Sequence, residues 1–496
     1  MDRAAGKNPP LLSKSRFIAG LQCPLRLWYQ CYAPQLASDI RPAQQAIFDT
    51  GREVGHLATG RYPGGTLIEE DHLHHAEAVR STTAAMGQSD TPAIYEAAFG
   101  FEGIRVRVDV LERSLSGRWN LVEVKSATAV RDVHLWDVAV QLHVLSGSGL
   151  SIDRAGLLHI NTAYVHPGQA PVLAELFHFD DLTPLVFARQ EDTHAQLGRL
   201  RQVLSEGQPP AIQPSRHCKH PHLCEFWDHC TDKMPEFWVL QLSGISQSRL
   251  DELSRLEISD IRDIPAGFPL TEIQDRIRTC VQTQTEYRSP NLARELGLLQ
   301  HPIHFIDFET VGPAVPRYPG TRPYQSLPFQ FSDHILRRDG SVDHREYLCR
   351  EDKDPRTEFT RALLDALTAD GSVVIYTTYE KKILRALAND LPEMREALHA
   401  AVDRTVDLHA MIKKHYYHPQ FRGSFSLKSV LPALLPQMDY QDLAIQEGSQ
   451  ASVEYLRMIG PQTPAAEKEK IERDLLAYCG QDTLAMVRIR EALLGS

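Results

Sequence analysis

Two parts of the sequence place carboxylates where they could hold a divalent cation. In the first, Asp109 ends the alternating segment RVRVD, and Glu123 and Lys125 follow in LVEVK. Residues i and i+2 of a strand point to one face of a sheet, so Glu123 and Lys125 should share a face. Two carboxylates can bind a cation that activates water against a phosphate, and a lysine can stabilise the developing charge. A charged hairpin without chemistry is the alternative.

The second set of candidate ligands is spread over the C-terminal part of the chain. Asp307 and Glu309 alternate in the apolar segment HFIDFE, and Glu380 follows the strand-like SVVIYTT near the start of a helix. Tyr478 and Asp482 are i and i+4 in the helical segment LLAYCGQDTLAMV, so they lie on one helix face. Acids in this arrangement can hold metal ions against a phosphate, and a solvated acidic surface is the alternative.

The third constellation consists of cysteines. Cys218, Cys224 and Cys230 lie in the array CKHPHLCEFWDHC, and Cys23 stands alone near the N-terminus in LQCPLRLWY. Thiolates at such close spacing bind a soft metal, and a cluster requires a fourth ligand. The histidines interleaved in the array make a zinc site the rival, and buried structural cysteines are the simplest alternative.

The composition limits the classes of protein that can carry these sites. With 42% hydrophobic and 24% charged residues, the 496-residue chain should form ordinary globular cores. Its formal net charge of −11 argues against a protein that coats nucleic acid through bulk positive charge. No apolar window is long enough for a membrane span, and residues 1–16 lack the apolar core of a secretory signal. We therefore expect a cytoplasmic protein without membrane contact.

The elements that must position these residues divide the chain into three blocks. Residues 1–240 contain a helical start, a strand-rich centre and a cysteine-rich end. Residues 241–298 should form short helices, because apolar residues recur at helical spacing in SQSRLDELSRLEISDIRDI. Residues 299–496 open with a strand and close with a long helix. The predicted fold class is α/β, with a helical middle segment between two domains.

The first block resembles the iron–sulfur branch of the RecB-like nucleases, which carry the PD-(D/E)xK motif on a restriction-endonuclease-like fold. The spacing of Asp109, Glu123 and Lys125 matches that motif. These nucleases place one cysteine before the nuclease core and three after it, and Cys31 is the substitute for the first of them. The resemblance implies a [4Fe–4S] cluster, with zinc as the alternative, held by Cys23, Cys218, Cys224 and Cys230.

Two further matches extend this resemblance. His56, in FDTGREVGHLA, matches the helical histidine that ligates the metal in those nucleases. Gln141, in WDVAVQLHVL, matches the glutamine of their Q-x-x-x-Y helix, and Leu145 stands where that helix has its tyrosine. The first site that the resemblance implies has Lys125 and Gln141 as catalytic residues and a Mg²⁺ or Mn²⁺ ion on His56, Asp109 and Glu123.

The third block resembles the DnaQ-like exonucleases, which have a ribonuclease-H-like fold. The strand Asp-x-Glu, the later acid and the helical Tyr-x3-Asp carry this resemblance. It implies 3′-to-5′ cleavage, with Tyr478 orienting the attacking water. Those exonucleases usually have aspartate at the position of Glu380. The resemblance also implies two Mg²⁺ or Mn²⁺ ions held by Asp307, Glu309, Glu380 and Asp482.

Two further segments could contact nucleic acid. The middle segment resembles helix-hairpin-helix DNA-binding units in LSGISQSRLDELSRLEISDIRDI, although packing between domains is the favoured interpretation. Lys428, in GSFSLK, stands near a helix start where it could meet a phosphate, and an ordinary surface lysine is the alternative.

These patterns predict a metal-dependent nuclease that hydrolyses phosphodiester bonds at two centres. DNA is favoured over RNA as the substrate, because the relatives of the first block act on DNA, and a DNA repair or defence complex is the expected setting. In one alternative only the C-terminal exonuclease is active, on RNA. In another, both sites are degenerate and the protein is a nucleic-acid-binding subunit of a larger complex.

Overall fold

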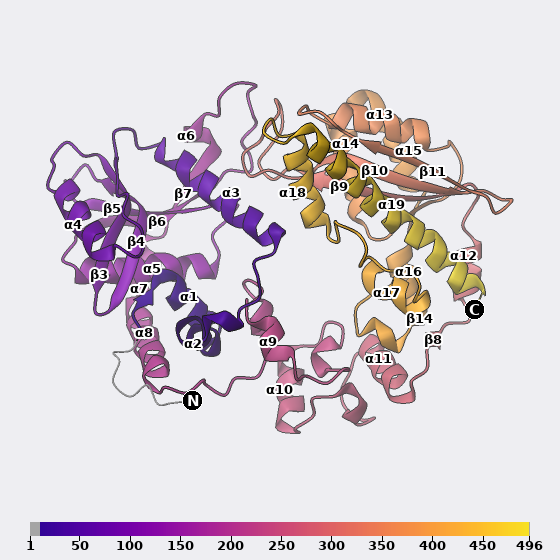
Figure 1. Ribbon diagram of the computed structural model, residues 1–496, viewed down its shortest axis with the longest axis horizontal. Coiled ribbons are helices and arrows are strands. Elements are labelled where there is room, and N and C mark those ends of the chain that lie inside the picture. Colours follow the sequence, from indigo (N-terminus) through magenta and orange to yellow (C-terminus); the bar gives the residue numbers. More distant parts are fainter. Residues whose placement is uncertain (1–9, 496) are drawn as a thin grey trace. The chain divides into compact units, whose positions relative to one another are not determined.

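The chain forms two compact units, which the computed structural model describes over residues 10–495. Unit 1 comprises Met1–Lys233 and Pro313–Tyr324, and unit 2 comprises Met234–Gly312 and Gln325–Ser496. Both units combine helices with a central sheet, which confirms the predicted α/β class (Figure 1). Residues 1–9, which make up most of the segment judged for a secretory signal, lie outside the described residues.

Unit 1 is built on a seven-stranded sheet in the order β2-β3-β4-β5-β6-β7, with β1 paired to β4. Strands β3, β4 and β5 form an antiparallel meander, whereas β5 and β6 are parallel and are joined through helix α5. The turn between β3 and β4 places Gly103 at φ 76°, a left-handed conformation that glycine adopts without penalty. The strands are β1 (Leu12–Ser13), β2 (Thr66–Leu67), β3 (Ala93–Phe101), β4 (Ile104–Arg113), β5 (Trp119–Lys125), β6 (Ile152–Ile160) and β7 (Phe177–Asp181).

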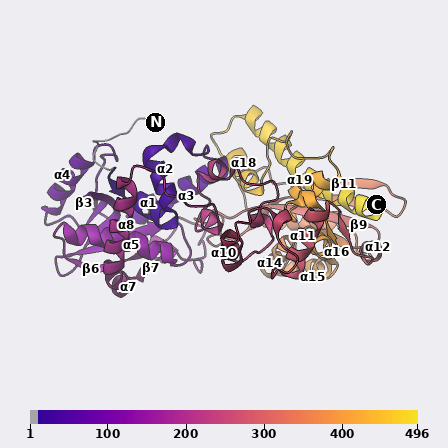
Figure 2. The same cartoon turned by 90° about the horizontal axis from the view of Figure 1, so that it is seen from below.

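Helix α5 (Asp132–Gly147) lies against one face of this sheet. Its segment 138–142 is completely buried, as expected for a helix enclosed by other elements. Helices α1 (Lys14–Gln22) and α8 (Gln190–Ser205) pack against α5 (Figure 2). The other helices of unit 1 are α2 (Pro24–Tyr32), η1 (Pro34–Leu36), α3 (Pro42–Thr59), α4 (His75–Met86), α6 (Leu173–Leu176), α7 (Thr183–Ala188), η2 (Arg216–Lys219) and α9 (Trp227–Thr231).

Helix α3 packs against the opposite face of the sheet, where Val54 joins the strand residue Val122 in one apolar cluster. Residues 313–324, which the sequence analysis assigned to the third block, belong to unit 1 and complete this cluster. Within this segment, Ala314 is buried, and the hydroxyl of Tyr324 donates a hydrogen bond to the carbonyl of Ser126. No sequence pattern indicated this excursion, because it depends on contacts between residues far apart in the chain.

Unit 2 contains a five-stranded sheet in the order β11-β10-β9-β12-β13 and a two-stranded ribbon of β8 and β14. Central strand β9 pairs antiparallel with β10 and parallel with β12. Its residues Ile306 and Phe308 enter an apolar cluster, so the alternate residues Asp307 and Glu309 face the other side. The strands are β8 (Tyr287–Arg288), β9 (Ile303–Val311), β10 (Leu327–Leu336), β11 (Val342–Leu348), β12 (Val373–Ile375), β13 (Thr405–Asp407) and β14 (Tyr416–Tyr417).

The long C-terminal helix α19 (Ala465–Gly495) packs against β9 and β10. It therefore carries its polar residues to the face of the sheet that holds the acids of β9. The other helices of unit 2 are η3 (Val239–Gln241), α10 (Gln247–Arg255), η4 (Ile261–Asp263), α11 (Glu272–Thr283), α12 (Leu292–Gly297), α13 (Arg356–Ala366), α14 (Tyr379–Asp390), η5 (Pro392–Met394), α15 (Arg395–Asp403), α16 (Leu408–His415), η6 (Pro419–Phe421), α17 (Leu427–Leu434) and α18 (Gly448–Ile459).

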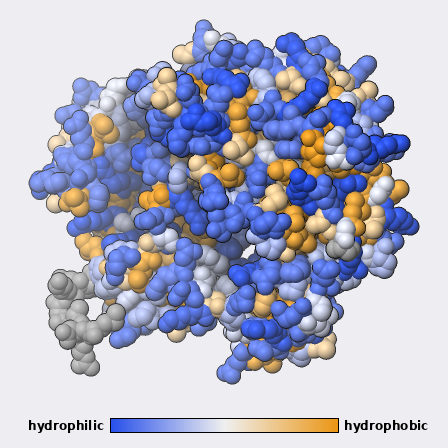
Figure 3. Space-filling model, turned by 45° about the vertical axis from the view of Figure 1, so that its right-hand side comes forward, coloured by the Kyte–Doolittle hydropathy of each residue, from blue (hydrophilic) through white to orange (hydrophobic). Residues whose placement is uncertain are grey.

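Residues 241–298 form short helices that cluster with unit 2 instead of standing as a separate body. Figure 3 shows a face of the molecule on which polar side chains predominate and apolar ones are scattered. Within residues 10–495, no helix is both long and apolar enough to cross a membrane.

Candidate active sites and metal centres

Strands β4 and β5 bring the first set of predicted residues to one face of the unit 1 sheet, here called the first acidic site. Glu123 is fully buried, and Lys125 Nζ lies 2.5 Å from its Oε1. Asp109 Oδ2 accepts a hydrogen bond of 2.7 Å from the backbone N–H of Val124. From α5, the amide of Gln141 donates a 2.7 Å hydrogen bond to Glu123 Oε2. The structure therefore gathers these predicted residues around one buried carboxylate.

Two further residues of this site, Lys14 and Asp137, were not predicted from the sequence. Lys14, the first residue of α1, donates to both oxygens of Glu123, at 2.8 and 2.9 Å. Asp137 on α5 lies 2.6 Å from Lys125 Nζ, one helical turn before Gln141. This i, i+4 relation was the available signal for Asp137. Nothing in the sequence connected Lys14 with a carboxylate so far along the chain.

The two lysines decide the charge balance of the first acidic site. Burial by itself raises the pKa of Glu123, but Lys125 and Lys14 outweigh it and hold that pKa well below its usual range. Burial and the charge of Glu123 raise the pKa of Asp109 to about 7. Burial by itself lowers the pKa of Lys14, but Asp137 and Glu123 outweigh it and raise that pKa. The ammonium groups thus neutralise Glu123 before any metal binds, whereas the pKa of Asp109 stays raised.

A pocket of about 540 Å³ is lined by Lys14, Asp109, Glu123 and Lys125, and His56 lies exposed at the same pocket. In the part of the chain that the structure describes, His56 does not approach Asp109 and Glu123 closely enough for all three ligand atoms to lie within 4.8 Å. Leu145, which replaces the tyrosine of the Q-x-x-x-Y helix, is fully buried in the unit 1 core. It places no hydroxyl in the pocket.

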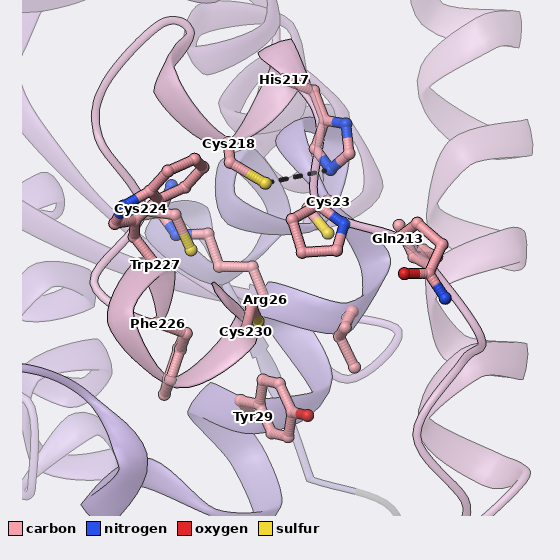
Figure 4. A pocket seen from close by; sticks show the side chains of 13 residues that line it. Cys23, Arg26, Tyr29, Gln213, His217, Cys218, Cys224, Phe226, Trp227 and Cys230 are labelled. Carbon is pink, nitrogen blue, oxygen red and sulfur yellow. Dashed lines mark hydrogen bonds between the residues drawn. The ribbon is translucent and has the colours of Figure 1, made fainter. Parts of the chain in front are cut away.

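The four predicted cysteines converge on a second pocket of unit 1, here called the cysteine pocket (Figure 4). Cys23 stands at the junction of α1 and α2, whereas Cys218 lies in η2 and Cys230 in α9. The backbone N–H of Cys224 donates to the carbonyl of Cys218 over 2.8 Å, which holds the loop between them. Cys31 packs against the main core of unit 1 instead of this pocket.

The cysteine pocket is enclosed by aromatic and basic side chains, including Tyr29 and Trp227. Burial raises the pKa of Cys224 to about 12 and that of Cys230 to about 11, so these sulfurs become thiolates only with a cation beside them. Among the described residues, no three of the pocket's sulfurs lie within 4.8 Å of one another. Four thiolates on one zinc ion stand about 3.8 Å apart, given a Zn–S bond of about 2.3 Å. The sulfurs are therefore spread more widely than a single zinc ion requires.

Strand β9 and helices α14 and α19 assemble the second acidic site within unit 2. Asp307, Glu309 and Asp482 each offer a carboxylate oxygen, and these oxygens lie within 4.8 Å of one another. Glu380, in the first turn of α14, is buried, and its Oε2 has no hydrogen-bond partner among the described residues. Tyr478 is buried one helical turn before Asp482. All five predicted residues therefore belong to the same region of unit 2.

The acids of the second acidic site repel one another. Burial and the charge of Asp482 raise the pKa of Asp307 well above its usual range and that of Glu309 to about 8. Burial raises the pKa of Glu380 to about 7 and that of Asp482 to about 6. Lys428 lowers the pKa of Glu309, but burial and repulsion outweigh it. The site therefore lacks enough positive charge to keep its carboxylates ionised.

Three neighbours add to this site. Lys428 Nζ lies 3.4 Å from the hydroxyl of Tyr478. This lysine, which the sequence suggested as a phosphate contact, therefore lies beside the acids. Tyr440 was not predicted from the sequence, and its hydroxyl donates a 2.5 Å hydrogen bond to Asp482 Oδ1. Asp407, at the end of β13, was not predicted either, and its charge raises the pKa of Glu380. Each is separated from its partner by a long and irregular stretch of chain that carries no local signal.

Comparisons with known proteins add little to this geometry. A family model described as "Domain of unknown function (DUF2779)" matches residues 304–426, a range that includes the acids of β9 and α14. No curated protein matches the chain. A solved structure described as "Crystal structure of SSO0001" is similar over 47% of this chain and 91% of its own, at 14% sequence identity and a TM-score of 0.21. That TM-score supports no conclusion about the fold or the function.

Proposed function

We propose that the chain is a metal-dependent nuclease that hydrolyses phosphodiester bonds, with DNA as the favoured substrate. The observation that carries this proposal is the second acidic site. Asp307, Glu309 and Asp482 bring carboxylate oxygens within 4.8 Å of one another, and a buried oxygen of Glu380 has no partner among the described residues. Buried carboxylates that repel one another need cations between them, and oxygen ligands suit Mg²⁺ and Mn²⁺.

Bound at these acids, two divalent cations would activate the attacking water and stabilise the leaving oxygen. The chain itself supplies the remaining groups. Burial and the charge of Asp482 raise the pKa of Tyr478, so its phenol stays protonated and can hydrogen-bond the water. Lys428, beside that hydroxyl, can bind a phosphate oxygen by a charge-assisted hydrogen bond. Tyr440 holds the carboxylate of Asp482 in place.

The first acidic site would be the second nuclease centre. Asp109 and Glu123 would hold its cation, His56 would stand at the edge of the pocket, and Lys125 would stabilise charge on the phosphate. Because Lys14 and Lys125 already contact Glu123, a cation must displace an ammonium from that carboxylate. We therefore expect weaker metal binding at the first acidic site than at the second.

A [4Fe–4S] cluster in the cysteine pocket fits the donor set better than a single zinc ion. Four cysteines line the pocket, and their sulfurs are spread more widely than one zinc ion requires. Each thiolate of such a cluster binds a different iron, so wider spacing is expected. The role would be structural, because the ligands tie the start of α2 to the segment around η2 and α9.

Cleavage of end-labelled single- and double-stranded DNA and RNA tests the proposal. The wild type should cleave DNA in the presence of Mg²⁺ or Mn²⁺, and EDTA should stop the cleavage. The double variant Asp307→Asn with Lys125→Met should be inactive. Asp403→Asn, an exposed acid at the end of α15, is the matched control and should retain activity. If the wild type cleaves no substrate with either cation, or if the double variant cleaves at the wild-type rate, the proposal fails.

A second candidate function keeps only the C-terminal centre active and makes unit 1 a nucleic-acid clamp. One observation favours it: the oxygens of Glu123 already accept hydrogen bonds from Lys14, Lys125 and Gln141. A carboxylate satisfied in this way has little demand for a cation. In that case Lys125→Met should leave every cleavage rate unchanged, whereas Asp307→Asn should abolish all of them.

A further inference from the structure

A further group of potential metal ligands lies on strands β6 and β7 of unit 1, outside the acidic sites and the cysteine pocket. His159 is on β6, and His178 and Asp180 are on β7. Each residue offers one ligand atom, and the three atoms lie within 4.8 Å of one another. His159 pairs with His178 across the antiparallel strands, and alternate residues share a face, so Asp180 lies on the same face as both.

The hydrogen bonds of His159 decide which of its nitrogens can bind a metal. Its Nδ1 lies 3.1 Å from the carbonyl oxygen of Ile160. A carbonyl only accepts hydrogen bonds, so Nδ1 carries a proton, and the lone pair that a metal could bind is that of Nε2. An imidazole N–H donated to a backbone carbonyl is the usual support of a metal-ligating histidine.

That lone pair faces a carboxylate. His159 Nε2 lies 2.8 Å from Asp180 Oδ2, and His178 Nε2 lies 3.3 Å from Asp180 Oδ1. A nitrogen lone pair and a carboxylate oxygen repel each other unless a cation, either a proton or a metal ion, lies between them. Ligands on zinc stand roughly 3.3–3.6 Å apart, given bonds of about 2.0–2.2 Å. Small side-chain movements would therefore bring all three ligands onto one ion.

The surrounding charges permit a cation here. Lys125 is the register neighbour of His159 on β5, but its ammonium contacts Glu123 at 2.5 Å and Asp137 at 2.6 Å. The side chain of His159 is 7% exposed, whereas that of His178 is 60% exposed. A bound ion would thus be anchored on the buried side and would keep open coordination positions toward solvent.

We propose that His159, His178 and Asp180 form a binding site for a divalent transition metal, with zinc as the best-matched ion. Two imidazoles and one carboxylate suit zinc, whereas Mg²⁺ prefers oxygen ligands alone. The site lies on the same sheet face as Lys125, yet it shares no ligand with the first acidic site. Its occupation is therefore independent of whether the chain cleaves nucleic acid.

The test is a Co²⁺ titration of the full chain, as purified with its cysteine pocket occupied and in excess Mg²⁺ to fill the acidic sites. Co²⁺ substitutes for Zn²⁺, and its visible d–d bands without a thiolate charge-transfer band report nitrogen and oxygen ligands. The variants are His178→Ala and Asp180→Asn, whose side chains are 60% and 36% exposed, so the fold should tolerate both. His399→Ala, an exposed histidine of α15, is the control.

The wild type and His399→Ala should bind one equivalent of Co²⁺ more than His178→Ala or Asp180→Asn. Added Zn²⁺ should displace this equivalent and remove its d–d bands. The proposal is overturned if His178→Ala and Asp180→Asn bind as much Co²⁺ as the wild type. It is also overturned if His399→Ala loses the same equivalent, which would indicate nonspecific histidine binding, or if excess Mg²⁺ displaces the ion.

Discussion

The two acidic sites of the molecule differ in what neutralises their carboxylates. In unit 1, Lys14 and Lys125 contact Glu123 directly, and they hold its pKa below the usual range against the effect of burial. In unit 2, the strongest influences on Asp307 after burial are the charges of Asp482 and Glu309, and its pKa is raised. One site carries its own cations, whereas the other needs them from solution.

Similar sets of acids can therefore differ in whether they need a metal ion to neutralise their charge. A buried carboxylate pair without counter-charge destabilises the fold until a cation arrives, so metal binding there is coupled to stability. A carboxylate held by two ammonium groups is stable without metal. A metal ion that binds it must displace an ammonium group, which weakens metal binding.

The largest expected effect is the loss, in Asp307→Asn, of the metal-dependent 3′-to-5′ cleavage proposed for the second acidic site. This change removes a central ligand from the second acidic site, so the loss should exceed the roughly 10–100-fold that removal of an outer-shell partner causes. Lys125→Met should leave that activity intact, because the first acidic site shares no residue with it. Rates on a 3′-labelled strand in Mg²⁺ measure the effect. Equal losses in both variants would mean that the two sites do not act separately.

The next effect concerns the cysteine pocket. Cys224→Ser should remove iron and acid-labile sulfide from anaerobically purified protein and should lower the unfolding temperature of unit 1, because cluster binding is coupled to folding. Cys31→Ser is the matched control, since Cys31 packs in the core away from the pocket. Metal analysis and calorimetry measure both outcomes. Stoichiometric zinc without iron in the wild type would contradict the cluster.

The pH dependence of metal stabilisation should separate the two acidic sites. Glu309 has a folded-state pKa of about 8 against an ordinary value of 4.5, so the metal-free native state binds more protons than the unfolded chain. Without metal, the stability of unit 2 should therefore fall as pH rises from about 5 to about 8, and Mn²⁺ should restore it. In unit 1, Glu123 has a lowered pKa, and its contribution to stability is fully present throughout this range and is lost only at more acid pH. Asp109, with a pKa of about 7, should lose stability over part of this range, so we expect a smaller fall for unit 1 than for unit 2.

Thermal unfolding at pH 5.5 and pH 8, with EDTA or with Mn²⁺, measures this contrast. The gain in unfolding temperature on adding Mn²⁺ should be larger at pH 8 by about 3 °C or more, which corresponds to about 1 kcal/mol for a domain of this size. Asp307→Asn should remove most of the difference. A larger gain at pH 5.5 than at pH 8 would contradict a raised pKa of Glu309 in the metal-free protein.

The smallest effect is expected for Tyr478→Phe. The change removes a hydroxyl that contacts Lys428 and can orient water, but it removes no metal ligand. Cleavage should slow by about tenfold, the equivalent of one hydrogen bond of about 1.4 kcal/mol. The Mn²⁺-dependent stabilisation should stay as in the wild type. A loss as large as that of Asp307→Asn would place the phenol among the groups essential to the reaction.

Much of each candidate site was predictable from local patterns. Alternation put Glu123 and Lys125 on one face of β5, and helical spacing placed Tyr478 one turn before Asp482, as the structure has them. The close spacing of the last three cysteines likewise indicated a common pocket. These relations hold because strand and helix periodicity depend on backbone geometry alone, which the local sequence determines.

The partners that set the charge of the sites were not predictable in this way. Lys14 reaches Glu123 only because α1 packs against α5, and Tyr440 reaches Asp482 from a segment without regular periodicity. Residues 313–324 likewise join unit 1 through contacts that no local pattern announces.

The sequence by itself determined the α/β class, the faces on which the acids stand and the grouping of the three close cysteines, because each depends on short-range periodicity or spacing. The tertiary structure alone decided which charges meet. Lys14 neutralises Glu123, whereas Asp307 and Glu309 are left facing Asp482. The physical reason is that electrostatic energy depends on distance in space and on burial, and both arise only when segments far apart in the chain pack together.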